Sequence, residues 1–116
     1  MRLVGLHLPV VTVAAGLLFS PLAWAAGSAE KGRVAYVKHG CWQCHGFAGQ
    51  GGVAGPKLAP NPMPLEALTV FLRNSNGAMP PYQKAILSDA DVADIHAYLQ
   101  GLPKAPDYKS IPLLNP

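Results

Sequence analysis

The stretch Cys41-Trp42-Gln43-Cys44-His45 contains the only two cysteines of this 116-residue chain. Cys-x-x-Cys-His is the attachment signature for a c-type haem. Two thiols at this spacing can each bond one vinyl group of the same porphyrin, and the adjacent histidine can then bind the iron as an axial ligand. Because the motif is short, its specificity depends on what precedes and follows it.

Other chemistry also uses two cysteines at this spacing. A thioredoxin-like dithiol opens a helix that follows a strand, and no strand pattern precedes Cys41. A zinc site needs further Cys or His ligands at short spacing, whereas the remaining His7, His39 and His96 are scattered. A structural disulfide is the simplest alternative in an exported protein. Haem attachment is the interpretation that the rest of the chain favours.

Residues 1–25 are typical of a secretory signal. Arg2 is followed by an apolar run, densest over residues 10–19, and an Ala-x-Ala site ends at Ala25, which is the pattern that a signal peptidase recognises. We therefore expect export to the periplasm, a location that suits haem c because its attachment takes place outside the bacterial cytoplasm. An uncleaved signal would instead leave a membrane anchor, since the apolar stretch is nearly long enough to span a bilayer.

The charge balance disfavours one class of partner and favours another. Nine Lys and Arg stand against six Asp and Glu, a formal net charge of +3, and 13% of the residues are charged. Two haem propionates would bring the exported protein close to neutral. No basic run with interleaved aromatic residues is present, so nucleic acid is not an expected partner. A surface with few charges favours a protein partner.

The expected domain is small and all-α. Residues 26–103 are predicted to form it, and residues 104–116 to form a proline-rich tail without periodicity. A domain of this size is short of core-forming residues, so a covalently held porphyrin would form part of the core. No strand pattern and no internal repeat appears in the sequence.

A first helix and a long loop surround the cysteine motif. The helix is predicted over residues 29–38, with Ser28 as its cap and Glu30 at the positive end of its dipole. Gly40 ends it. Residues 46–62 contain five glycines and three prolines, which predicts a loop. A loop of this length in a compact domain is usually functional.

A second helix is predicted over residues 64–73, because proline suits a first helical turn. Its apolar residues recur at helical spacing and are expected to face the core. They are Leu65, Leu68, Phe71 and Leu72.

A turn and an extended segment separate this helix from the last one. Residues 74–77 are typical of a turn, and residues 78–82 are expected to be extended because two prolines force the residues before them out of the helical region. The last helix follows a capping box made by Ser88 and Asp91 and ends near Gly101. Its apolar stripe consists of Val92, Ile95, Leu99 and Leu102.

In this order the elements resemble a class I cytochrome c of the small bacterial, mono-haem type. The resemblance covers residues 27–102 and excludes the tail. It implies an all-α, cytochrome c-like fold, in which three to four short helices wrap around one covalently bound haem c. Its most specific parts are Cys41-Trp42-Gln43-Cys44-His45, Gly55-Pro56-Lys57-Leu58, Met79-Pro80-Pro81-Tyr82 and Asp94-Ile95-His96-Ala97-Tyr98-Leu99.

The resemblance implies roles for five residues on one side of the haem. Cys41 and Cys44 would form the thioethers, and His45 would be the proximal iron ligand. The carbonyl of Pro56 would accept a hydrogen bond from Nδ1 of that histidine, which fixes the ring and raises its basicity. Leu58 would pack on the haem.

The resemblance also implies that the first and last helices cross. Gly32 and Tyr36 would meet Ile95 and Tyr98 at the crossing. Tyr36 lies five residues before the first cysteine, where the family commonly has four, so we expect the crossing to be slightly shifted.

Met79 is the residue that we expect at the sixth position of the iron. A thioether favours Fe(II), so ligation by His and Met raises the reduction potential. Met79 lies on a segment stiffened by prolines between two helices, which suits a ligand that must stay in place. Met63, which also precedes a proline, is the rival, and His96 on the last helix is a further alternative. An ordinary core methionine is the plainest interpretation.

These residues predict an electron carrier and no enzyme. With His45 and Met79 both bound to iron, a haem has no open position for substrate, and no nucleophile–base or paired-carboxylate arrangement appears elsewhere in the sequence. The alternative is a haem enzyme or gas-binding module with a labile distal ligand.

The expected partners are other redox proteins. The carrier would be either a free periplasmic shuttle or the electron-accepting subunit of a dehydrogenase, and could also serve a terminal oxidase or another cytochrome. The low charge and the proline-rich tail favour the subunit. A membrane association is expected only if the signal is uncleaved.

Overall fold

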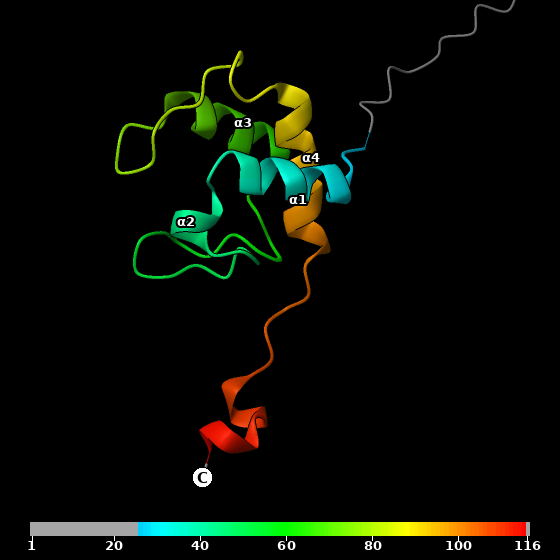
Figure 1. Ribbon diagram of the computed structural model, residues 1–116, viewed down its shortest axis with the longest axis vertical. Helices are drawn as coiled ribbons and strands as arrows, with labels where there is room; N and C mark the ends of the chain where they lie inside the picture. The colour runs from blue at the N-terminus through cyan, green and yellow to red at the C-terminus, as the bar shows by residue number, and fades with distance from the viewer. Residues whose placement is uncertain (1–25, 116) are drawn as a thin grey trace, which may run out of the picture.

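The computed structural model describes residues 26–115, so the predicted signal at residues 1–25 lies outside the described residues. Within that range the chain is all-helical and has no strand, which confirms the predicted fold class. Figure 1 shows the α-helices gathered into one body. In chain order the elements are α1 (Ala29–Lys38), α2 (Trp42–His45), α3 (Leu65–Asn74), α4 (Asp89–Gly101) and the short 3-10 turns η1 (Tyr108–Ser110) and η2 (Pro112–Leu114).

Helix α1 has the predicted bounds and the predicted cap. The Ser28 hydroxyl accepts a hydrogen bond from the main-chain N–H of Lys31, which satisfies a donor that a helix start otherwise leaves free. The main-chain N–H of Ser28 donates to Asp94 Oδ1 at 2.6 Å. The start of α1 is therefore tied to the middle of α4.

Helices α1 and α4 cross closely, as Figure 1 shows. A side chain at Gly32 would overlap the carbonyl oxygen of Asp94 and crowd Cβ of Tyr98, so the approach requires glycine. The rings of Tyr36 and Tyr98 meet at the crossing, with centroids 5.5 Å apart. The predicted contact between the two helices is confirmed, and the extra residue before the cysteines does not prevent it.

One core cluster joins α1, α3 and α4. Tyr36, Leu87, Val92 and Leu99 are its fully buried members. Burial of such side chains is the main favourable contribution to folding. The remaining members are Ala35, Ala59, Leu68, Leu72 and Ile95.

Helix α3 lies one residue later than predicted, because Pro64 is its N-cap and does not occupy its first turn. Leu68 and Leu72 face the core as expected, but Phe71 is 47% exposed. Residue 71 is three from residue 68 but only one from residue 72, so it lies at the edge of the stripe that these two residues form. There it lines a groove with Met63 and Val70. Only part of the predicted apolar stripe is therefore buried.

Helix α4 begins with the predicted capping box. The Ser88 hydroxyl accepts from the main-chain N–H of Asp91 at 3.0 Å, and the Asp91 carboxylate accepts from the main-chain N–H of Ser88 at 3.3 Å. The reciprocal pair satisfies two donors at the helix start. It also fixes the point at which the segment after α3 enters α4.

The tail after α4 extends away from the four helices (Figure 1). Its apolar side chains are exposed, with Leu113 at 93% and Tyr108 at 60%. Hydrogen bonds within the tail hold its two short turns, including Asn115 Nδ2 to the Tyr108 carbonyl at 2.6 Å. Among residues 26–115, no helix has the length and apolar character that crossing a membrane requires.

Candidate functional site

The cysteine motif forms a single helical turn, α2, which the sequence analysis did not predict. Cys41 is its N-cap, and Trp42–His45 are its helical residues. Four residues are too few to show a periodic pattern, although the flanking Gly40 and Gly46 mark its limits. Residues three apart share one face of a helix, so the thiols of Cys41 and Cys44 can serve one planar ligand.

Both thiols are free. Cys41 is partly buried and Cys44 is exposed, so they do not form the disulfide considered above. Burial raises the pKa of the Cys41 thiol to about 11, and this thiol is therefore neutral at physiological pH. Within residues 26–115, no group of three or more His, Cys, Asp or Glu side chains is arranged to hold a metal ion, and a zinc site gains no support.

His45 is buried, with 6% of its surface exposed. Its Nδ1 lies 2.8 Å from the carbonyl oxygen of Pro56. Because a carbonyl can only accept, Nδ1 carries a proton and donates it to Pro56, which leaves Nε2 as the ring nitrogen that could bind a metal. The predicted hydrogen bond is present, and the binding of iron by Nε2 stays a prediction.

Gly55 allows the loop to approach the His45 ring. A Cβ at this position would lie 3.0 Å from both Nδ1 and Cε1 of His45 and 2.9 Å from the Cys44 carbonyl oxygen. These distances are shorter than ordinary van der Waals contacts, so a larger residue would push the Pro56 carbonyl away. The sequence analysis singled out Gly55 as part of a motif but did not identify this role.

Two tyrosines hold the start of the loop against the helix crossing. Tyr36 Oη donates to the Gly46 carbonyl at 2.8 Å, and Tyr98 Oη donates to the Phe47 carbonyl at 2.7 Å. Burial, followed by the charges of Cys41 and Tyr98, raises the pKa of Tyr36 above its ordinary range. The Tyr36 hydroxyl therefore stays protonated and keeps its role as a donor.

An aromatic pair joins α2 to the residues that follow it. The rings of Trp42 and Phe47 are stacked, with centroids 4.5 Å apart and planes 11° from parallel. Phe47 is 59% exposed. Such an offset aromatic contact stabilises local structure, and here it joins the motif to the loop that follows it.

Met79 is half-buried and packs against the same core cluster as Cys41 and Leu58. Its carbonyl oxygen accepts a hydrogen bond from the hydroxyl of Ser75 at 2.7 Å, and Ser75 itself is buried. The sequence analysis placed Ser75 in a turn and missed this contact. Figure 1 shows that the segment between α3 and α4 and the α2 turn project towards the same side of the molecule.

Tyr82 fixes the far end of the Met79 segment. Its main-chain N–H donates to the Leu72 carbonyl at 2.8 Å, and its hydroxyl donates to the His39 carbonyl at 3.0 Å. Burial, followed by the charges of Cys41 and Cys44, raises the pKa of Tyr82. The segment that carries Met79 is therefore tied both to α3 and to the residue that follows α1.

The two rival ligands contact each other. His96 Nε2 lies 3.1 Å from the Met63 carbonyl oxygen and must donate to it. The side chain of Met63 is 41% exposed and lines the groove on α3. No residue of α2 or of the loop 46–62 lines that groove. Met79 shares a packing cluster with the cysteine motif, so the arrangement favours Met79.

These residues suit a haem bound through α2. Two free thiols lie on one helical turn, and the His45 ring beside them is oriented by Pro56. The half-buried thioether of Met79, on the same cluster, could supply a soft second ligand. Leu58 adds an apolar contact beside this site.

Comparison with known proteins supports the same interpretation. A family model described as "Cytochrome C oxidase, cbb3-type, subunit III" matches residues 27–99, which is more than half of the chain. No curated protein and no solved structure gave a significant match. The matched residues run from Gly27, just before α1, to Leu99 in α4 and include each predicted site residue.

Proposed function

The chain belongs to the family of c-type cytochrome domains described as cytochrome c oxidase, cbb3-type, subunit III, and on that premise we propose that it carries single electrons between redox proteins in the periplasm. Membership makes it an electron-transfer haem protein, and a single haem per chain is part of the proposal. The periplasmic location, the residues that hold the haem and the partners are the proposed parts.

One observation carries the proposal most directly. The Pro56 carbonyl oxygen lies 2.8 Å from His45 Nδ1, so the imidazole is held in one tautomer with Nε2 left for iron. An outer partner of this kind fixes the orientation of a ligating histidine and makes it a better donor to the metal. The buried position of His45 suits a permanent axial ligand.

The cysteines give the haem its attachment. Cys41 and Cys44 would each form one thioether to the same porphyrin, which commits the cofactor to this protein. When bound, the haem supplies a one-electron iron couple. The chain contributes a fixed position and a mostly apolar surrounding for that couple, and each turnover accepts one electron from a donor and passes one to an acceptor.

Met79 would complete the axial pair. A thioether stabilises Fe(II) and raises the reduction potential, and the contact between Ser75 and the Met79 carbonyl limits the movement of this residue. With both His45 and Met79 bound, the iron would have no position left for oxygen or substrate. This separates a carrier from the alternative of a haem enzyme or gas-binding module.

Spectroscopy of the protein made with cytochrome c maturation machinery tests the proposal. We expect a pyridine haemochrome spectrum of one haem c per chain, a six-coordinate His/Met spectrum in both oxidation states and a reversible one-electron titration. A five-coordinate ferric haem, or rapid carbon monoxide binding by the reduced protein at neutral pH, would favour the enzyme or gas-binding alternative.

The periplasmic location rests on the signal pattern of residues 1–25 and on the site of haem c attachment. Fractionation of cells expressing the full chain tests it, together with the N-terminal sequence of the product. We expect haem-containing protein that begins near Ala26 in the periplasmic fraction. Recovery of the haem protein in the membrane fraction with Met1 or Arg2 retained would indicate an anchor.

We propose further that the carrier docks on a larger redox enzyme as its electron-accepting subunit, either a dehydrogenase or a component of an oxidase complex. Exposed apolar residues of the loop after α2 support this proposal, since Phe47 is 59% exposed and Val53 is fully exposed. The apolar tail supports it as well. Co-purification of a catalytic chain with the native protein is the expected result, and a lone monomer on gel filtration of a periplasmic extract would favour a free shuttle.

A further inference from the structure

The segment from residue 75 to residue 88 has few main-chain bonds to hold it near Met79. Pro80 and Pro81 follow Met79 directly, and proline has no N–H to donate. The first main-chain donor after them is Tyr82, which bonds the Leu72 carbonyl. On the C-terminal side of Met79, the position of the segment therefore depends on the contacts that hold Tyr82.

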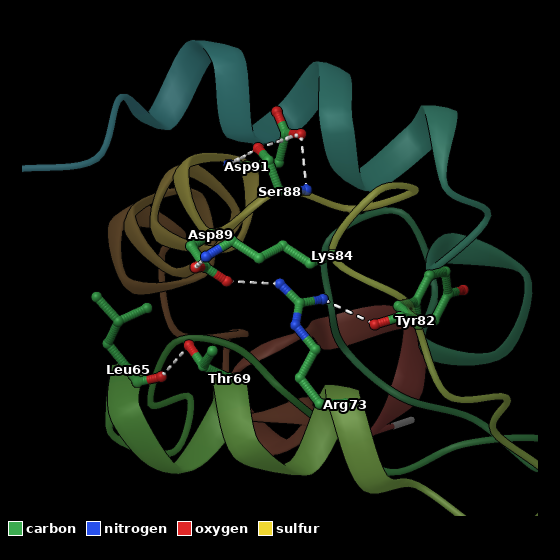
Figure 2. A network of polar contacts seen from close by, with 8 residues as sticks. All are labelled: Leu65, Thr69, Arg73, Tyr82, Lys84, Ser88, Asp89 and Asp91. Carbon is green, nitrogen blue, oxygen red and sulfur yellow. Dashed lines mark hydrogen bonds and ion pairs between the residues drawn. The ribbon is translucent and has the colours of Figure 1, made fainter.

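Arg73, in the last turn of α3, bonds the Tyr82 carbonyl. Its Nη1 donates to that oxygen at 2.8 Å, while its Nη2 donates to Asp89 Oδ1 at 2.7 Å. Figure 2 shows the guanidinium between these two acceptors. The Arg73 side chain is 19% exposed, so water screens these bonds less than it would at an open surface.

Asp89 in turn holds the guanidinium in place. It is the first residue of α4, where a negative charge is favoured by the helix dipole. Lys84 pairs with its second oxygen. Hydrogen bonds from Lys84 and then from Arg73 lower the pKa of Asp89, which keeps it ionised at neutral pH. Arg73 thus connects α3, the Met79 segment and the start of α4.

We propose that Arg73, oriented by Asp89, is a positioning residue that holds the Met79 segment so that the thioether stays at the iron. The inference rests on the proposed role of Met79 as the sixth ligand. Arginine suits this task because its planar fork can satisfy two acceptors at once in fixed directions. Lysine would keep the charge beside Asp89 but has no such fork.

Competition with imidazole measures this role in the haem-loaded full chain. Added imidazole binds the ferric iron only by displacing Met79, so a less firmly held segment binds imidazole more tightly. For Arg73→Lys we expect about tenfold tighter imidazole binding, the size of one lost charge-assisted hydrogen bond, and a weaker methionine-to-iron absorption band. For Asp89→Ala we expect a smaller change in the same direction, about threefold.

A matched control separates positioning from general loss of stability. Asp91→Ala removes the capping box of the same helix without touching Tyr82, so it lowers the denaturation midpoint while leaving imidazole affinity within about twofold of wild type. If Arg73→Lys fails to retain haem, Asp89→Ala provides the same comparison. Unchanged imidazole affinity in both variants, or an equal increase in Asp91→Ala, would overturn the inference.

Failure of the ligand assignment would look different. It would appear in wild type as a missing methionine band, or in Met79→Ala as an imidazole affinity equal to that of wild type. Either result is obtained without any Arg73 variant. It overturns the assignment of Met79 as the sixth ligand, and the positioning role of Arg73 with it. If wild type shows the methionine-to-iron absorption band and the Arg73 and Asp89 variants keep its imidazole affinity, only the positioning role is overturned.

Discussion

The two sides of the proposed haem site are held by different kinds of bond. The loop 46–62, which supports His45, is held mainly by bonds within its own main chain, with the Tyr36 and Tyr98 hydroxyls added at its start. The carbonyl of His45 accepts from the N–H of Gly51 at 2.8 Å, and the carbonyl of Gly49 accepts from the N–H groups of Leu58 and Ala59 at 2.8 and 3.0 Å. These contacts involve few side chains and follow from the path of the loop.

The segment that carries Met79 is held chiefly by side chains. Ser75, Arg73 and the hydroxyl of Tyr82 bond main-chain oxygens along or beside it. Among the described residues, the segment from residue 75 to residue 82 makes one main-chain hydrogen bond, from the N–H of Tyr82 to the Leu72 carbonyl. The histidine side should therefore respond chiefly to substitutions that disturb the path of its main chain, whereas the methionine side should respond to the truncation of several side chains.

Loss of the cysteines should have the largest effect, because it removes the cofactor from both sides at once. We expect Cys41→Ala with Cys44→Ala to abolish covalent haem and to reduce the yield of folded protein severely, since a domain this small depends on its cofactor for much of its core. Haem staining and circular dichroism measure the two effects. Gln43→Ala, an exposed position between the cysteines, is the control. A well-folded apoprotein would contradict the expectation.

Removal of Met79 should affect only the methionine side of the proposed haem site. We expect Met79→Ala to retain covalent haem, to bind carbon monoxide when reduced, and to lower the reduction potential by on the order of 59 mV or more, which is a tenfold change in a one-electron equilibrium. Redox titration measures the shift. Met63→Ala, at the groove on α3, should leave the potential near that of wild type, and the reverse pattern would make Met63 the ligand.

A substitution in the loop 46–62 tests the histidine side of the proposed haem site. Gly55→Ala places a Cβ 3.0 Å from the His45 ring and should lower the free energy of unfolding by about 1–3 kcal/mol, as overpacking does. Gly52→Ala is the control, because a Cβ there meets no atom within 4 Å. Denaturant titration of both variants measures the difference. Equal stability of the two would show that the loop moves aside without cost.

We expect the smallest effect on stability from the capping box of α4, which belongs to neither the histidine side nor the methionine side of the proposed haem site. Hydrogen bonds from Ser88 lower the pKa of Asp91, so its contribution is present above the unfolded pKa and is lost as pH falls through the folded value. We expect Asp91→Ala to cost about 1 kcal/mol at neutral pH. The cost should shrink below about pH 3.9. Thermal melts across pH measure it, and a cost independent of pH would contradict the assignment.

The sequence predicted what depends on neighbours along the chain. Helix α1, the capping box of α4 and the break at Pro80-Pro81 all arise from local signals, and they lie within about a residue of the prediction. The hydrogen bond from His45 to Pro56 came from family resemblance, because nothing local to either residue indicates it.

The contacts that were missed join residues whose approach only the folded chain reveals. Arg73 is an ordinary helix-end cation in the sequence, and only the position of Asp89 and Tyr82 gives it two acceptors. Ser75 resembles any turn serine until the Met79 carbonyl lies above it. Phe71 was assigned to the core because helical spacing defines a stripe but not its edge.

The stacked pair of Trp42 and Phe47 has a practical consequence for optical work. Trp42 is the only tryptophan outside the predicted signal, since the other is Trp24. It lies next to a cysteine that would carry the porphyrin, so energy transfer should quench its emission even in denaturant. The intensity of tryptophan fluorescence in this protein should then report whether haem has been attached, and it should change little when the protein unfolds.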